Sequence, residues 1–181
     1  MAIWNVIQHS NISTNTTAFE VTSIPQTYEH LFLFYHIRSG TTGPSQSGVT
    51  FASLQVGGGG SLNTDSDYSQ IFEYGVTSSA GMSKSHSNSS WQNLYIAPYH
   101  STYAIGWLWI PGYRRADRYK QLLARNNYTG YSSSNGTFGN QIYAGLLKDT
   151  DPITNLKLYH ASHTFGDHST ITLYGIGNTN S

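Results

Sequence analysis

The stretch "SIPQTYEHLFLFYHIRSG", residues 23–40, decides the fold. Its second half alternates between two sets of side chains that point to opposite faces of an extended strand. One set is apolar and comprises Leu31, Leu33, Tyr35 and Ile37. The other set is still largely apolar and comprises Phe32, Phe34 and His36. Such a strand needs cover on both faces, or cover by its own core on one face and by a partner on the other.

The residues around this strand predict an all-β chain. Pro25 lacks an N–H and fixes φ, so it ends strand pairing, and Gln26 with Thr27 can form the turn that follows. Clusters of Gly, Ser, Asn and Asp recur at residues 39–48, 57–67, 78–90, 132–140 and 148–152. The β-prone runs between them amount to roughly eight to ten short strands. The pattern predicts a single antiparallel β-sandwich or jelly-roll domain over residues 1–181, with a short N-terminal arm of about residues 1–15.

Composition restricts the partners. Of 181 residues only 10% are charged, against roughly 25% in ordinary domains, and the formal net charge is zero. Neither a nucleic acid nor a membrane is expected as a partner, because both need a basic excess or a long apolar run. The chain has no cysteine, and its 14 Tyr, 7 Phe and 4 Trp suit a contact surface.

Residues 114–125, "RRADRYKQLLAR", are compatible with two structures. They contain good helix formers and could form a helix of about three turns. The same residues also fit a turn, "PGYRRAD", followed by a strand, "YKQLLAR". We favour the turn and strand.

Two clusters could hold a metal ion. Asp65 and Asp67 in "NTDSD" place oxygen ligands at alternate positions, although the loop lacks the central glycine and distal glutamate of an EF-hand. A polar loop capped by its own Asx side chains explains them equally. His160 and His163 would point to opposite faces of a strand, so surface or interface histidines are the simpler interpretation. We expect no metal and no cofactor.

Enzymatic activity finds no support in the sequence. No G-x-S-x-G nucleophile motif occurs, and the glycine run at 57–60 is not followed by the Lys-Ser/Thr pair of a phosphate loop. The nine acidic residues show no pairing of the kind that glycoside hydrolysis needs.

Two groups of residues are candidates for contact with a protein partner. Four lie in a basic cluster that continues to Arg125, and an arginine-rich cluster can pair with carboxylates of an acidic surface. Two more are tryptophans of the run "AIGWLWIPGY", which fits either a central core strand or a strand buried in an oligomer. These candidates are Arg114, Arg115, Arg118, Lys120, Trp107 and Trp109.

Five segments together resemble a family of small virion proteins of tailed bacteriophages. They are "IPQTYEHL" within residues 19–33, "NTDSDYS" at 63–69, "WIPGYRRADRYK" at 109–120, "DPITNLKL" at 151–158 and "STITLYGIG" at 169–177. The most specific parts are "IPQTY" and "LYGI". The resemblance implies a jelly-roll or sandwich protein on the virion surface, without catalytic residues.

Within that family the resemblance implies a capsid decoration (cement) protein. Such a protein would be a homotrimer that binds the phage major capsid protein, and other virion proteins as well, and stabilises the lattice. The alternative is a tail-fibre or adsorption module that binds a host surface glycan. Its candidate contacts are Trp91, Tyr95 and Tyr99.

Overall fold

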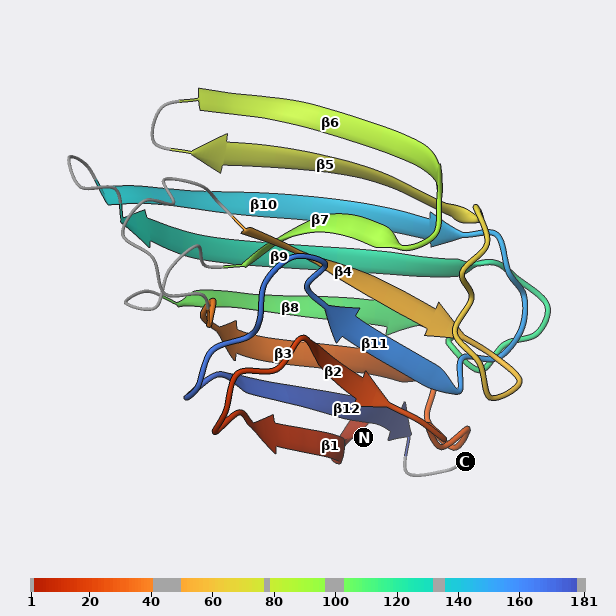
Figure 1. The fold of residues 1–181 in the computed structure, drawn as a ribbon. Helices are drawn as coiled ribbons and strands as arrows, with labels where there is room; N and C mark the ends of the chain where they lie inside the picture. Colours follow the sequence, from red (N-terminus) through yellow and green to blue (C-terminus); the bar gives the residue numbers. More distant parts are fainter. Residues whose placement is uncertain (1, 41–49, 77–78, 97–102, 132–135, 179–181) are drawn as a thin grey trace.

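The computed structural model describes residues 2–40, 50–76, 79–96, 103–131 and 136–178, and Figure 1 shows their fold. Twelve strands form two antiparallel sheets that pack face to face, which confirms the predicted β-sandwich. The strands are β1 (Ala2–Asn11), β2 (Ala18–Val21), β3 (His30–Ile37), β4 (Thr50–Gly57), β5 (Tyr68–Val76), β6 (Ser79–Asn88), β7 (Trp91–Ile96), β8 (Ala104–Pro111), β9 (Lys120–Tyr131), β10 (Gly136–Leu147), β11 (Asn155–Tyr159) and β12 (Thr170–Asn178).

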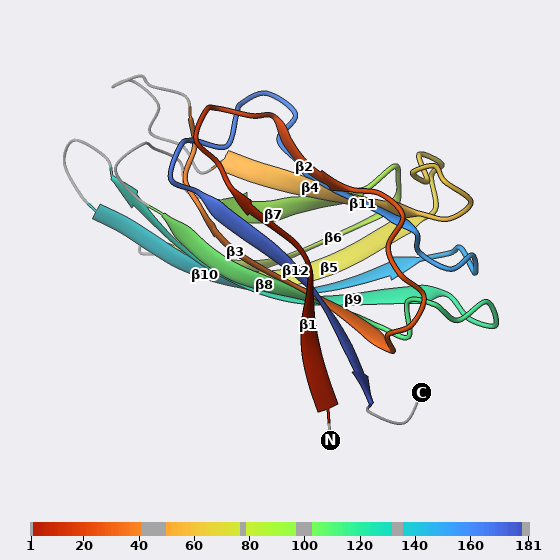
Figure 2. The same cartoon turned by 90° about the horizontal axis from the view of Figure 1, so that it is seen from below.

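The strand order is that of a jelly roll enlarged by two hairpins. The large sheet has the order β1-β12-β3-β8-β9-β10-β5-β6, and the small sheet has the order β2-β11-β4-β7. Without the hairpins β5–β6 and β9–β10, two four-stranded sheets remain, β1-β12-β3-β8 and β2-β11-β4-β7, which is the double Greek key of a jelly roll. Both hairpins join the large sheet on one side, so it spans twice as many strands as the sheet that covers it (Figures 1 and 2).

The strand that decides the fold lies in the middle of the jelly-roll part of the large sheet. β3 spans His30–Ile37 and pairs with β12 on one side and β8 on the other. The predicted inner set of β3 is buried at 0–1% exposure: Leu31, Leu33, Tyr35 and Ile37. These side chains pack against Leu156 and Leu158 of β11 within a single core, so the predicted facing of this strand is confirmed.

The proline-led segment forms the predicted turn at Gln26–Thr27. Its groups are tied to the loop that precedes β11. The N–H of Ile24 donates to the carbonyl oxygen of Thr154 at 2.9 Å, and Nε2 of Gln26 donates to that of Ile153 at 2.8 Å. The hydroxyl of Tyr113 donates to the carbonyl oxygen of Pro25. The turn therefore directs the chain from the small sheet into the centre of the large one.

Two strands differ from the sequence-based prediction. Residues 2–11, expected within an N-terminal arm, form β1 and pair with β12, and the two strands extend together beyond the sandwich (Figure 2). Residues 79–88, expected in a turn-forming cluster, form β6 and pair with β5. Every described side chain of β6 is exposed or half-exposed. Because neither face of β6 enters the core, it shows no apolar alternation by which a strand is recognised.

A line of polar side chains crosses the otherwise apolar core. The hydroxyl of Tyr35 donates to Oδ1 of Asn126, and Nδ2 of Asn126 donates to Oε1 of Gln141 at 2.7 Å. Nε2 of Gln141 in turn donates to the carbonyl oxygen of Asn93 on the small sheet at 2.9 Å. Burial raises the pKa of Tyr35, so its hydroxyl remains a donor at neutral pH.

This chain of hydrogen bonds depends on a close approach at Gly106. A Cβ at position 106 would lie 2.4 Å from the hydroxyl oxygen of Tyr35 and 2.7 Å from Oδ1 of Asn126. We therefore expect Gly106→Ala to lower the free energy of unfolding by roughly 1–3 kcal/mol, because the added methyl displaces both partners. Urea denaturation monitored by tryptophan fluorescence would measure the change.

The matched control is Gly75→Ala, which also lies in a strand of the large sheet. There the nearest heavy atom to an added Cβ is 3.8 Å away. The control should change stability by less than about 1 kcal/mol. Equal losses in the two variants would contradict the assigned role of Gly106.

Candidate interaction surface

The outer face of the large sheet is the most unusual surface of the molecule. By outer face we mean those side chains of the eight strands that point away from the small sheet. The strand register arranges them in rows that run from β6 to β1. The middle row is Met82, Glu73, Ile142, Arg125, Trp107, Phe34, Thr172 and His9. The next row is Lys84, Ile71, Ala144, Leu123, Trp109, Phe32, Tyr174 and Val6.

Exposed apolar side chains gather on this face. Of the twelve large apolar side chains that are exposed in the described part of the chain, nine belong to it. The nine are Trp4, Val6, Phe34, Ile71, Met82, Ile105, Leu123, Phe138 and Ile142. The side chains of Trp4 and Phe138 are 53% and 67% exposed. A sheet face with this many exposed large apolar side chains is unusual on a protein that remains alone in water.

Aromatic rings form a connected cluster on the part of the face that β1, β12, β3 and β8 supply. Trp4 makes edge contacts with Phe32 and Tyr174, with ring centroids 5.0 and 5.8 Å apart. Phe32 stacks on Trp107 at 5.8 Å. Trp109 meets the ring of His30 at 5.7 Å. The rings hold one another in place, which lowers the entropy cost of using them as contacts.

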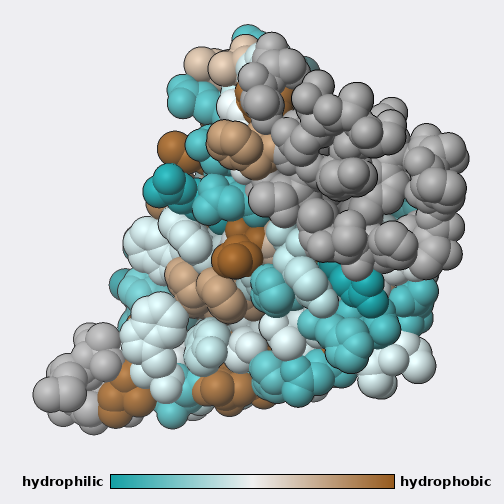
Figure 3. Space-filling view, turned by 90° about the vertical axis from the view of Figure 1, so that its left-hand side faces the viewer, coloured by the Kyte–Doolittle hydropathy of each residue, from teal (hydrophilic) through white to brown (hydrophobic). Residues whose placement is uncertain are grey.

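The view from the strand ends shows how apolar and polar residues mix on the surface. In Figure 3 brown apolar residues lie between pale and teal residues and form no continuous block. The predicted contact residues Trp107 and Trp109 lie on the outer face and are half-buried. Their placement fits the oligomer interpretation of "AIGWLWIPGY" as well as the core-strand interpretation, because Leu108 and Ile110 of the same strand are buried.

The predicted basic cluster is largely occupied by contacts within the chain. Arg114 forms an ion pair with Glu29, and both side chains are about one-third exposed. Arg118 donates twice to Asp117, at 2.9 and 3.0 Å. These bonds lower the pKa of Asp117 to about 2. Arg115 is exposed and remains a candidate for contact with a partner.

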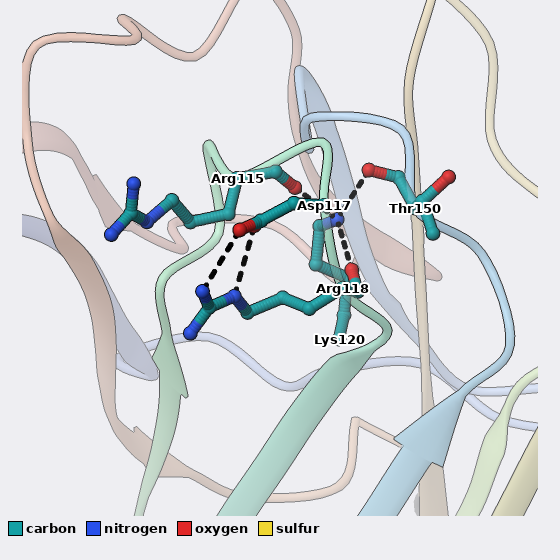
Figure 4. A network of polar contacts seen from close by, with 5 residues as sticks. All are labelled: Arg115, Asp117, Arg118, Lys120 and Thr150. Atoms are coloured by element: carbon teal, nitrogen blue, oxygen red, sulfur yellow. Dashed lines mark hydrogen bonds and ion pairs between the residues drawn. The ribbon is translucent and has the colours of Figure 1, made fainter.

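Lys120 is wrong as a partner contact, because it is 1% exposed. Figure 4 shows its ammonium group among the carbonyl oxygens of Arg115, Arg118 and Thr150, at 2.7, 3.2 and 2.7 Å. Burial lowers its pKa, and the nearby carboxylates of Asp149 and Asp151 act in the opposite direction. The ammonium group thus connects the turn before β9 with the segment after β10 by donating hydrogen bonds to carbonyl oxygens of both.

Of the three proposed glycan contacts, Trp91 is not on the surface. Trp91 is fully buried, meets the ring of Tyr68 edge-on at 5.2 Å, and therefore cannot stack on a sugar. A Cβ at Gly145 would lie 2.4 Å from Nε1 of Trp91, so this strand position admits only a glycine. Tyr95 lies in β7, where its backbone pairs with Phe51, and Tyr99 lies outside the described residues.

The two metal candidates do not assemble a site. Oδ1 of Asn63 accepts the N–H of Asp65 at 2.9 Å, which is the Asx turn of the simpler interpretation, and Asp67 lies at the start of β5. His160 and His163 follow β11 in a loop, which brings their rings to 4.6 Å. Nδ1 of His160 is already an acceptor for the N–H groups of Ser162 and His163. In the described ranges no three His, Cys, Asp or Glu side chains converge on one point.

The outer face also contains Glu73 and Ile142, which sequence reasoning missed, beside Arg125 of the predicted basic cluster. Arg125 and Glu73 flank Ile142 on neighbouring strands, and all three are exposed. The signal was the alternation within residues 120–125 and 141–146, which places Leu123 with Arg125, and Ile142 with Ala144, opposite the buried Leu122 and Tyr143. Only the pairing of β9, β10 and β5 brings these residues into one surface.

Comparisons with known proteins leave the chain on its own. No family model matches it, and neither the curated proteins nor the solved structures contain a significant match. No helix in the described residues is long and apolar enough to cross a membrane.

We expect Lys120→Met to lower the free energy of unfolding by roughly 2–3 kcal/mol, because it leaves three carbonyl oxygens without their donor. The control is Lys148→Met, which removes an exposed ammonium group near the same turn. Guanidinium denaturation of both variants measures the difference. If Lys120→Met were as stable as the control, the carbonyl cage would not hold the two turns together.

Burial, with a smaller effect of His163, lowers the pKa of His160 from 6.5 to about 4. The folded protein thus binds this proton more weakly than the unfolded chain does. The free energy of unfolding should fall by about 1–3 kcal/mol as the pH drops from about 6.5 to about 4. His160→Asn, whose carbonyl oxygen can still accept the loop N–H groups, should flatten this dependence in urea titrations across that range.

The matched control for this pH dependence is His86→Asn on the exposed strand β6. It should retain the wild-type fall in stability between the same pH values. A wild-type protein whose stability is unchanged across the range would show that His160 titrates alike in the folded and unfolded chains.

Proposed function

We propose that this chain is a structural protein of a bacteriophage virion that decorates the capsid and stabilises it. The observation that carries the proposal is the outer face of the large sheet, which presents nine exposed large apolar side chains. A surface of this kind serves assembly with other protein copies, because it is too apolar for a protein that acts alone. The bacteriophage assignment rests on the sequence resemblance of the segments around "IPQTY" and "LYGI".

The fold is compatible with this role without proving it. Jelly rolls are common in viral capsid proteins, and they also occur in lectins and enzymes. A fold of this type therefore supports an assembly function only together with a surface that suits it. Here that surface is apolar and aromatic, and in the described residues no cluster of metal ligands accompanies it.

The mechanism that we propose is thermodynamic. A protein that binds the assembled lattice and not its separated subunits raises the free energy needed to separate them. Several weak contacts on one oligomer act together, so each contact can be small and polar. The exposed guanidinium of Arg115 and the exposed tyrosine ring of Tyr119 lie at one end of the large sheet and suit a contact with an acidic capsid surface.

The structure argues against the alternative function, a module that binds a host surface glycan. Trp91 was its principal sugar-stacking candidate, and Trp91 is buried in the core. The aromatic residues of the outer face, such as Trp4, Phe32 and Trp107, contact one another on the surface of the sheet. We therefore propose the capsid role alone.

Quantitative mass spectrometry of purified phage particles that encode this chain tests the proposal. We expect a copy number comparable to that of the major capsid protein, and we expect particles that lack the chain to lose their genome at lower temperature. A copy number far below that of the capsid protein would indicate a tail component. Absence from the particle would overturn the proposal.

Arg115→Glu tests the capsid contact separately, because this side chain is exposed and its loss leaves the fold intact. Bound protein would be measured after added variant is incubated with particles that lack it. Arg115→Glu should reduce occupancy at least several-fold, whereas Lys148→Glu, which is also exposed, should not.

A further inference from the structure

We propose that two copies of this chain pair through their outer faces, related by a two-fold axis that runs along β8. This inference goes beyond the proposed function, because it concerns the chain by itself and holds whether or not the partner is a capsid. The outer face of one copy binds the outer face of a second copy. Three observations carry it: the division of the face into two halves, its charges and its size.

The face consists of two complementary halves. The first half belongs to β1, β12 and β3 and is aromatic, with Trp4, Tyr174, Phe32 and Phe34. The second half belongs to β9, β10 and β5 and is mainly aliphatic, with Leu123, Ile142 and Ile71 as its large aliphatic side chains. It also carries the exposed ring of Phe138 and the charged side chains of Arg125 and Glu73. β8 lies between the halves with Ile105, Trp107 and Trp109. A two-fold axis along β8 places the aromatic half of each copy on the aliphatic half of the other.

The charges on the face select the direction of that axis. Arg125 and Glu73 lie in one row on either side of Ile142. An axis along this row, across the strands, would place Arg125 against Arg125 and Glu73 against Glu73 of the second copy. Like charges that face each other in a dry interface are strongly unfavourable. An axis along the strands avoids both contacts.

With the axis along β8, the strand register assigns each row a partner row. In the middle row Trp107 faces Trp107 of the second copy, Phe34 faces Arg125, and His9 faces Glu73. A guanidinium over a phenyl ring is a favourable cation–π pair, and a carboxylate favours a protonated imidazole. In the next row Phe32 faces Leu123 and Val6 faces Ile71 of the second copy. The tryptophans thus occupy the centre and Glu73 lies toward the rim, as in stable interfaces. Arg125 lies one strand from the axis, where the ring of Phe34 covers its guanidinium.

The size of the face matches what a stable pair needs. The axis pairs seven strands, β1 to β5 in sheet order, and leaves the polar strand β6 outside. Strands ~4.8 Å apart and ~3.3 Å per residue over eight residues give a face of roughly 34 by 26 Å, or about 900 Å² on each copy. A standard protein interface buries about 800 Å² per partner. Two sheets in such contact pack ~10 Å apart, as in the interior of a sandwich.

A trimer, which the sequence resemblance implies, would use this face differently. In a threefold ring each copy presents one surface to a different surface of its neighbour. The outer face would then need a second apolar surface of similar size to meet. The other sheet carries Phe51 as its one exposed large apolar side chain in the described residues, so it supplies no such surface. In a two-fold pair the same outer face is buried on both copies, so no second apolar surface is needed.

A single cysteine on the axis tests the inference sharply, because the chain contains no cysteine. Ile105 is exposed and lies on β8, so the proposed axis brings it next to Ile105 of the second copy. Purified Ile105→Cys, treated with a short thiol-reactive bismaleimide that can span two sheets ~10 Å apart, should form a covalently linked dimer in high yield. Two matched variants should remain monomers on a non-reducing gel: Phe51→Cys on the opposite sheet and Ile142→Cys on β10 of the same face.

The outcomes separate the alternatives. Cross-linking of Ile142→Cys in place of Ile105→Cys would move the axis to β10 and overturn the proposed one. Cross-linking of Phe51→Cys alone would overturn the assignment of the outer face. Sedimentation of the wild-type protein provides a measurement that needs no variant: a monomer at micromolar concentration, or a trimer, overturns the pair. Trp107→Ser should weaken the dimer more than about tenfold, and Phe51→Ser should leave it unchanged.

These results are independent of the test on phage particles. A dimer that is absent from virions would overturn the proposed function and leave the pairing intact. A monomer that decorates capsids in high copy number would overturn the pairing and leave the proposed function intact.

Discussion

The structure depends on one imbalance: a sheet of eight strands is covered by a sheet of four. The small sheet buries the inner side chains of β3 and β8, including Leu33, Tyr35 and Leu108, into a closed core. No described strand covers the other side of the large sheet, where Phe34, Ile105 and Ile142 remain exposed. Burial of apolar side chains between the sheets stabilises the fold. The same effect favours association of the exposed outer face with another protein surface.

Several of the few charged groups of the chain form contacts within the fold, which leaves fewer charges for the surface. Lys120 is buried against three carbonyl oxygens, and Arg114 is paired with Glu29. Arg38 is paired with Asp167 in the loops that join β3 and β12 to the rest of the fold. Charged side chains that are buried or paired within the fold add little to the polarity of the surface. A chain with only 10% charged residues therefore presents Ser, Asn, Tyr and apolar side chains to its surroundings.

The sequence predicted the parts of the fold in which apolar alternation and turn chemistry agree. β3 and the turn at Gln26–Thr27 are examples, because a run of alternating large side chains follows a proline. β6 could not be predicted, since a strand exposed on both faces carries no alternation. The roles of Trp91 and Lys120 were equally hidden. The residue type alone does not say whether a tryptophan or a lysine is exposed or buried. Trp91 is buried because Gly145 leaves room for its ring, and Lys120 is buried because the carbonyl oxygens of Arg115 and Thr150 accept its hydrogen bonds.

The two inserted hairpins explain why the face has two halves. The aromatic half comes from strands of the jelly roll itself, β1, β12 and β3, and β8 lies between the halves. The mainly aliphatic half, which also carries Phe138, comes from β9, β10 and β5. A bare jelly roll would have an aromatic face of four strands with no complementary surface on the same molecule. Adding hairpins to one side of that sheet extends the inner core under β7 and, by the same backbone, supplies the aliphatic surface that a second copy's rings can cover. The two hairpins that widen the large sheet beyond the small one thus also supply the surface that can cover the aromatic half of a second copy.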